Sequence, residues 1–182
     1  MINYIGKNSG WYFAMILMVV GFVCLFFFQR SKSTQLIETG LNTVGHFQYQ
    51  ESSLLDFKQE KKGIWSYTID GARYEKLKTI PFQINTNEYY TVYYDSKNKE
   101  DIEIAYDQFV LIGTFKNTEA IETNRSWLNS NVIDFKYKVK DTEYTRSQYL
   151  KSEMAVNPKK KYLVKYKVGS PQTAYIFVDS IK

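Results

Sequence analysis

The loop from Asp95 to Asp101 is the stretch whose residue types come closest to a metal site. Its sequence, DSKNKED, places three acidic residues and one amide within seven positions. A calcium-binding loop needs an acidic or amide ligand at its third position and a glycine at its sixth, between two helices. Lys97 and Glu100 occupy those positions. The sequence therefore predicts a solvated turn and no metal.

Residues for nucleophilic or acid–base chemistry are sparse. The chain has one histidine, His46, and one cysteine, Cys24, which lies inside an apolar run. Gly-x-Ser-x-Gly, the phosphate loop and the dinucleotide fingerprint are all missing from the sequence. We therefore predict no enzyme activity, no catalytic residue and no cofactor. The alternative left open is an enzyme, or an enzyme accessory, whose carboxylates come together from distant strands.

Lysines alternate with apolar residues on two strand-like runs near the C-terminus. Residues 110–182 carry thirteen basic and seven acidic residues, a net charge of +6, whereas residues 40–109 carry eight and eleven, a net charge of −3. Alternate side chains of a strand share a face. We predict that the lysines form a basic face, and that tyrosines occupy the corresponding face of the preceding region. These candidate interaction residues are Lys136, Lys138, Lys140, Lys161, Lys165, Lys167, Tyr89 and Tyr93.

The basic face admits several partners. Anionic lipid headgroups or an acidic surface of a membrane protein would bind it, at about 1 kcal/mol per lysine near a membrane. The alternative is that the lysines only discourage edge-to-edge aggregation. Nucleic acid is not expected, because single-strand binding sheets present aromatic and basic residues together. Here the two kinds of residue alternate and fall on opposite faces.

The elements that must position these residues are strands. Tyr, Thr, Val and Ile are frequent after residue 40, and they favour β-structure. Alternation predicts ten strands, separated by short turns such as Asp70-Gly71, a two-residue hairpin signal. The predicted strands are residues 43–51, 64–70, 72–78, 88–95, 101–106, 111–121, 132–140, 142–147, 160–167 and 173–178.

The ten predicted strands form two copies of one pattern. YTIDGARY at 67–74 resembles YKVKDTEY at 137–144, and YTVYY at 90–94 resembles YLVKY at 162–166. Gly45 before Phe47 also matches Gly113 before Phe115. An internal duplication follows, with the first β-repeat at 42–109 and the second at 110–182. Each copy is expected to be a small antiparallel meander sheet or partly closed barrel.

Alternation also predicts which side chains form each core. In the first copy these are Trp65, Tyr67, Ile69, Tyr90, Val92 and Tyr94. In the second they are Phe135, Tyr137, Val139, Tyr162, Val164 and Tyr166.

The repeated motifs resemble an uncharacterised family of bacterial membrane-anchored β-domains, known only as domains of unknown function. Its members carry Tyr-x-Val-x-Gly-x-x-Tyr followed by Val-x-Tyr-x-Pro-x-x-Pro. The first copy matches at Tyr67, Ile69, Gly71, Tyr74, Val92 and Tyr94, and has Lys97 and Lys99 near the expected prolines. The second copy matches at Tyr137, Val139, Tyr144, Val164, Tyr166 and Pro171, and has Asp141 in place of the hairpin glycine. The resemblance implies a mainly β fold with a membrane anchor, and no catalytic residue.

Trp11–Phe28 is a run of eighteen residues without a charge. As a helix it would be about 27 Å long, close to the thickness of a bilayer core. A cleaved signal peptide has a shorter apolar core followed by small residues, whereas this run ends in three phenylalanines. We predict a retained transmembrane helix at 11–28, a polar lead at 1–10 and a juxtamembrane linker at 29–41.

Together these features predict a single-pass, non-catalytic binding or assembly subunit of a membrane protein complex. Other membrane-protein subunits are the expected partners, and the cytoplasmic (inner) membrane the expected location. Arg30 and Lys32 outnumber Lys7, so the positive-inside rule favours a cytoplasmic C-terminal part.

Overall fold

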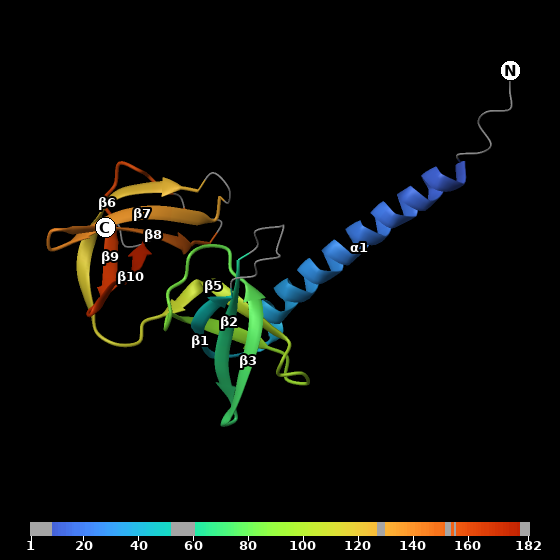
Figure 1. Cartoon of the computed structure of the whole chain (residues 1–182), viewed down its shortest axis with the longest axis horizontal. Coiled ribbons are helices and arrows are strands. Elements are labelled where there is room, and N and C mark those ends of the chain that lie inside the picture. Colours follow the sequence, from blue (N-terminus) through green and yellow to red (C-terminus); the bar gives the residue numbers. More distant parts are fainter. Residues whose placement is uncertain (1–8, 52–60, 127–129, 152–153, 155, 179–182) are drawn as a thin grey trace, which may run out of the picture. The chain divides into compact units, whose positions relative to one another are not determined.

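The computed structural model describes residues 9–51, 61–126, 130–151, 154 and 156–178. It divides into two compact units, one ending at Gly40 and the other beginning at Leu41. The first unit holds helix α1 (Ser9–Thr39) and the second holds ten strands in two antiparallel sheets (Figure 1). The predicted fold class, mainly β with one N-terminal helix, is confirmed.

Helix α1 is longer than the apolar run predicts. It continues through the segment that we expected to be a juxtamembrane linker and ends at Thr39. Residues 29–39 contain neither Gly nor Pro, the residues that most disfavour a helix. Gly40, which donates its amide to the carbonyl of Leu36 at 2.9 Å, is the single residue between α1 and β1. Of the polar lead predicted at 1–10, residues 1–8 lie outside the described residues, and Ser9 and Gly10 belong to α1.

The first sheet contains β1 (Leu41–Glu51), β2 (Lys62–Ile69), β3 (Ala72–Thr79), β4 (Tyr89–Tyr94) and β5 (Ile102–Val110). The second contains β6 (Phe115–Arg125), β7 (Val132–Val139), β8 (Thr142–Tyr149), β9 (Leu163–Lys167) and β10 (Ser170–Phe177). Their strand orders are β3-β2-β1-β4-β5 and β8-β7-β6-β9-β10. The two orders are identical once the second set is renumbered, as a duplication requires.

Each sheet curls so that its two edge strands are bridged by side chains. In the second sheet the Gln148 amide on β8 donates to the carbonyl of Ile176 on β10 at 3.0 Å and accepts from its N–H at 2.8 Å. The residue at the same place on β3 is Lys78, whose Nζ donates to the carbonyl of Ile102 on β5 at 2.7 Å. Both sheets are therefore partly closed barrels, and the second is nearly closed.

The predicted core faces are confirmed. Ten of the twelve side chains are buried, from Val92 at 0% exposed to Tyr94 at 9%. Val139 and Tyr166 are partly buried against the second core. The hairpin prediction is also confirmed, because Asp70 and Gly71 have φ of 51° and 79°. Gly71 adopts this conformation at no steric cost.

The glycine landmark of the duplication is wrong. Gly45 pairs with Tyr67, and Tyr137, the counterpart of Tyr67, pairs with Ala120. Ala120 is therefore the structural counterpart of Gly45, whereas Gly113 precedes β6 in a loop with φ of 107°. The central strands of the two sheets are β1 and β6. The difference in residue number between their corresponding positions is several residues larger than that between the other corresponding strands, and a match of short motifs does not detect this.

Candidate binding site between the two sheets

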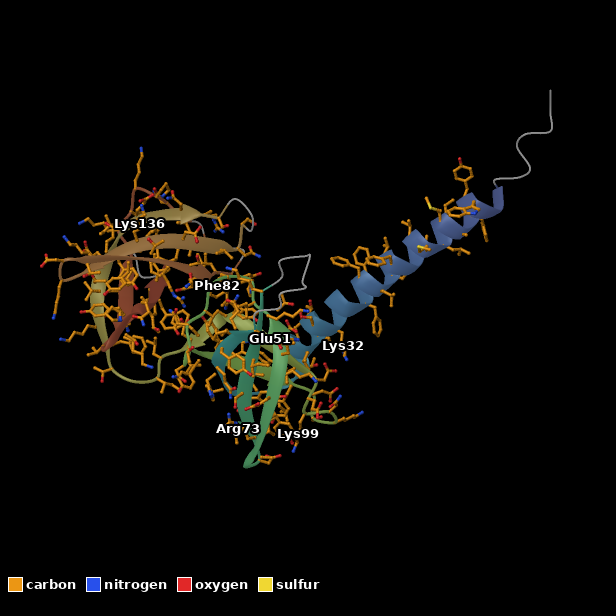
Figure 2. The ribbon with its side chains drawn as sticks, in the orientation of Figure 1. Lys32, Glu51, Arg73, Phe82, Lys99 and Lys136 are labelled. Carbon is orange, nitrogen blue, oxygen red and sulfur yellow. The ribbon has the colours of Figure 1, made fainter. Side chains whose placement is uncertain are left out.

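The predicted lysines share a sheet, but acidic residues lie among them. Strand β6 runs between β7 and β9 and carries Glu119 and Glu122. Lys136 pairs with Glu122 at 2.7 Å and Lys161 with Glu119 at 3.0 Å. The hydrogen bond from Lys136 lowers the pKa of the Glu122 carboxyl. This part of the face is consequently mixed in charge; Lys136 is labelled in Figure 2.

Some of the remaining predicted residues are exposed to solvent, some contact their own sheet and one pair makes a contact between the two sheets. Lys138 and Lys140 are exposed. The ammonium of Lys165 lies 5.0 Å from the ring centre of Phe177, and that of Lys167 lies 5.9 Å from the ring centre of Tyr89 in the first sheet. Tyr93 donates its hydroxyl to Gln108 Oε1 at 3.2 Å. The interaction role of all eight residues stays a prediction.

A buried ion pair between the two sheets was not predicted from the sequence. Glu88, just before β4, is 0% exposed and pairs with Arg146 of β8, which is 4% exposed. Arg146 also donates to the carbonyl of Gln83 at 2.7 Å. The Glu88 carboxylate accepts hydrogen bonds from the Tyr90 hydroxyl at 3.1 Å, from the Tyr175 hydroxyl at 3.4 Å and from the backbone N–H of Asn85 at 2.8 Å.

Burial controls the protonation of this network. It raises the pKa of Glu88 above its ordinary value, although the Arg146 guanidinium acts in the opposite direction. Burial also raises the pKa of Tyr90 and of Tyr175, and the Glu88 charge adds to both shifts. Both phenols therefore stay protonated and serve as hydrogen-bond donors to the carboxylate.

The ion pair exists because the two copies diverged. The repeat offsets place Lys160 where the first copy has Glu88, and Lys76 where the second copy has Arg146. In the second copy Asn157 and Tyr162 correspond to Asn85 and Tyr90, and the backbone N–H of Asn157 donates to the Tyr162 hydroxyl at 2.7 Å. One sequence signal for the pair exists: Glu88 and Arg146 both occupy positions that alternate with solvent-facing residues and so point inward.

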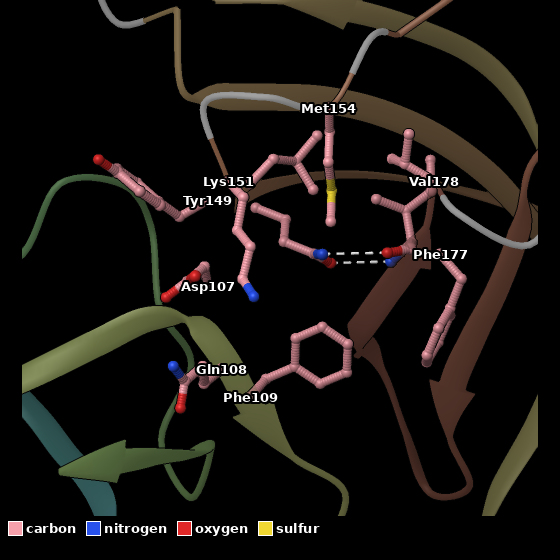
Figure 3. A pocket seen from close by; sticks show the side chains of 11 residues that line it. Asp107, Gln108, Phe109, Tyr149, Lys151, Met154, Phe177 and Val178 are labelled. Atoms are coloured by element: carbon pink, nitrogen blue, oxygen red, sulfur yellow. Dashed lines mark hydrogen bonds between the residues drawn. The ribbon is translucent and has the colours of Figure 1, made fainter. Parts of the chain in front are cut away.

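A cleft of about 410 Å³ opens beside this network, between the end of β5 and the ends of β8 and β10 (Figure 3). Its lining is mostly apolar and includes Phe109, Leu150, Met154, Ile176, Phe177 and Val178. Phe109 stacks on Tyr175 with ring centres 4.2 Å apart and contacts Phe177 edge-on at 5.5 Å. The cleft therefore has walls that aromatic packing holds in place.

Polar groups stand around the cleft, and most of them already have partners. Gln148 bonds to Ile176, Gln108 accepts from Tyr93, and the Tyr149 hydroxyl accepts from Asn131 at 3.0 Å. Within the described part of the chain, the charged groups of Asp107 and Lys151 have no hydrogen-bond or ion-pair partner. The cleft thus offers an apolar interior and two unlike charges that a ligand could engage.

Metal chemistry finds no support among the described residues, where no three His, Cys, Asp or Glu side chains are grouped to hold an ion. His46 lies with its ring 5.7 Å from that of Tyr89. The Asp95–Asp101 segment is a turn between β4 and β5, in which Asp95 accepts the Lys97 amide at 2.7 Å. These contacts are those of a structural turn and a surface ring pair.

Comparisons of the chain with protein-family models, with curated proteins and with solved structures found no match. The family resemblance of the motifs therefore stays an expectation from the sequence.

Proposed function

We propose that this chain is a single-pass, membrane-anchored binding or assembly subunit of a membrane protein complex, without catalytic activity. The observation that carries the proposal is the exposure of the apolar part of α1. Every side chain from Trp11 to Phe28 is exposed to its surroundings, and none is charged. Soluble proteins rarely leave so large an apolar surface uncovered.

A bilayer is the environment that best covers such a surface. Eleven of these eighteen residues are Phe, Ile, Leu or Val. Each favours insertion by roughly 0.3–0.6 kcal/mol near the centre of a membrane helix, so together they supply about 3–7 kcal/mol. A signal sequence near an N-terminus would meet the same criteria of length and composition. The length of the run and its bulky C-terminal end favour retention.

The compact unit that begins at Leu41, the β unit, supports a role in binding. Its two barrels share a buried ion pair, and the cleft beside that pair is concave, largely apolar and bordered by a few polar groups. Ligand sites in proteins have this character. The apolar run is joined to β1 by the helical residues 29–39 and by Gly40, so an anchored helix would tether the β unit to the membrane.

The test is to express the full chain with a C-terminal tag and to determine its mass and its partition. We expect the uncleaved chain in the membrane fraction after alkaline carbonate extraction, and stoichiometric co-purifying subunits after solubilisation in detergent. A variant with Leu17→Lys and Val20→Lys should leave the membrane fraction. A shortened chain released from the membrane would contradict the anchor, and an anchored chain without companions would contradict the assembly role.

We propose that α1 spans the cytoplasmic (inner) membrane and that the C-terminal part of the chain faces the cytoplasm. The support is the excess of Arg30 and Lys32 over Lys7, which itself lies outside the described residues. Reporter enzymes fused after Lys182, one active only in the cytoplasm and one active only outside it, give the orientation directly. Activity of the second reporter alone would reverse this assignment and leave the binding role intact.

A further inference from the structure

We propose that the cleft between the two sheets binds an extended, apolar peptide segment of a partner protein. The proposal rests on the function proposed above and names the chemistry that the partner presents. It is carried by a strand irregularity, by two charges that have no partner among the described residues and by the apolar lining of the cleft.

Strand β5 carries three residues that have no pairing partner in β4. Tyr90 pairs with Phe109, whereas the next residue, Thr91, pairs with Ala105. Tyr106, Asp107 and Gln108 are therefore extra residues in β5. Bulges of this kind re-aim side chains and are frequent beside functional sites. Here Asp107 and Gln108 line the cleft (Figure 3).

The last strand of the second copy has an irregularity of the same length at a different place. Ser170 of β10 pairs with Lys167 and Ala174 pairs with Tyr166, so three residues of β10 between them have no pairing partner in β9, whereas residues 174–177 pair without a register shift. By the repeat offset, Phe177 is the counterpart of Ala105. β5 continues past Ala105 to Val110, and its residues Asp107, Gln108 and Phe109 form one wall of the cleft.

The charges at the cleft suit a peptide main chain. Asp107 can accept hydrogen bonds from peptide N–H groups, and Lys151 can donate to peptide carbonyls. The other polar side chains around the cleft already bond within the chain, as described above. A carboxylate beside an ammonium suits a ligand that brings both donors and acceptors, and it disfavours a purely anionic ligand.

The apolar interior sets the pattern of the peptide. In an extended chain, side chains two positions apart point the same way. A cleft of about 410 Å³ lined by Phe109, Met154 and Val178 can receive apolar side chains of this spacing. Its walls are held in place by the Phe109–Tyr175 stack and by the Gln148–Ile176 hydrogen bonds. Such preorganisation lowers the entropy cost of binding.

The experiment selects phage-displayed random octapeptides on the detergent-solubilised full chain. The expected consensus has apolar residues at positions i and i+2 and no net negative charge. A selected peptide is then synthesised and titrated against variants with Asp107→Lys, Lys151→Glu or Met154→Trp. We expect each substitution to raise its Kd at least tenfold. The matched controls Asp141→Lys and Lys116→Glu, at exposed positions away from the cleft, should leave Kd unchanged.

Four results would overturn the proposal. The first is a selection that yields no consensus sequence, and the second is peptide binding that all three cleft variants retain. The third is displacement of the peptide by lauric acid, if Lys151→Glu leaves the binding of lauric acid unchanged. Near-ultraviolet circular dichroism of each variant shows whether it is folded, and Met154→Gln replaces Met154→Trp if the larger residue unfolds the chain. Companion subunits that still co-purify with the cleft variants would refute the peptide site while leaving the proposed assembly function standing.

Discussion

At the scale of single residues, equivalent tyrosines stabilise both barrels by the same contacts. Tyr67 donates its hydroxyl to the Lys99 carbonyl at 3.0 Å, and Tyr137 donates to the Pro171 carbonyl. Tyr67 stacks on Tyr74 with ring centres 5.5 Å apart, and Tyr137 stacks on Tyr144 at 5.6 Å. The tyrosines of the repeated motif therefore join the second strand of each copy to the segment where its last strand begins, the turn at Lys99 in the first copy and Pro171 of β10 in the second.

The burial of these tyrosines predicts a loss of stability at alkaline pH. Burial raises the pKa of Tyr67 to about 12, and the nearby Glu100 adds to the shift. The unfolded value is about 10, so the contribution of this phenol is complete below pH 10 and is lost as pH rises towards 12. The loss is at most about 1.4 kcal/mol per pH unit.

Unfolding by urea, measured at intervals from pH 9 to 12, checks this prediction. Tyr67→Phe should be less stable at pH 9, because it lacks the hydrogen bond to Lys99, and should show a shallower decline above pH 10. Phenolate absorbance of the folded chain gives the pKa independently. An identical decline in wild type and variant would show that Tyr67 does not titrate in this range.

Gly45 provides a second test at this scale. A Cβ added there would lie 2.4 Å from Cγ2 of the buried Val92, and contacts that close force a core to shift. Gly45→Ala should therefore lower the free energy of unfolding by about 1–3 kcal/mol. Val92→Ala in the same chain should recover part of the loss. The second barrel accommodates Ala120 at the corresponding place, so a neutral Gly45→Ala would mean that β1 relaxes similarly.

At the scale of elements, one side chain in each barrel bridges the two edge strands. Gln148 reproduces a pair of strand hydrogen bonds across the gap between β8 and β10. Lys78 fulfils a similar role in the first barrel and also pairs with Glu103 at 3.0 Å. Sheet edges without such partners expose backbone groups to other chains.

Gln148→Leu should open the second barrel. The substitution keeps an apolar side chain of similar size but leaves the N–H and the carbonyl of Ile176 without partners, at a cost of about 1–3 kcal/mol. Amide hydrogen exchange at Ile176 should accelerate, whereas Lys138→Leu on the exposed part of β7 should leave it unchanged. Unchanged protection at Ile176 would show that strand packing alone closes the barrel.

At the scale of the whole β unit, the core of the first barrel includes residues of the second. Tyr175 and Val132 of the second sheet belong to the buried cluster of the first, and Asn85 Nδ2 donates to the Gln172 carbonyl at 2.9 Å. The Glu88–Arg146 pair lies within this junction. Removing one partner of a buried ion pair costs about 3–5 kcal/mol, because the other charge stays buried alone.

Arg146→Met should therefore uncouple the barrels. We expect the wild type to unfold in one transition and the variant in two, with the second barrel unfolding first. Hydrogen exchange of β2 reports on the first barrel and that of β7 on the second. The double substitution Glu88→Gln and Arg146→Met should be less damaging than the sum of its parts. Arg73→Met, which breaks an exposed pair with Glu75, should change stability by less than about 1 kcal/mol. Two transitions in the wild type would disprove the coupling.

Much of the fold is determined by the sequence alone, because its signals are local. Side-chain alternation identified the core faces around Trp65, Tyr90 and Phe135, and Asp70-Gly71 identified its hairpin. Composition identified the apolar helix. Each of these rules concerns residues within a few positions of one another, so neither the partner strand nor the partner sheet needs to be known.

The tertiary structure alone decided which distant residues meet. Glu88 and Arg146 are 58 positions apart, and their contact depends on how two barrels dock. Lys136 and Lys161 form ion pairs because β6 lies between β7 and β9 and brings Glu122 and Glu119 close to them. The cleft arises where an extended β5 meets the ends of β8 and β10. Strand order and docking are collective outcomes of packing and cross-strand pairing, which no single segment of the sequence encodes.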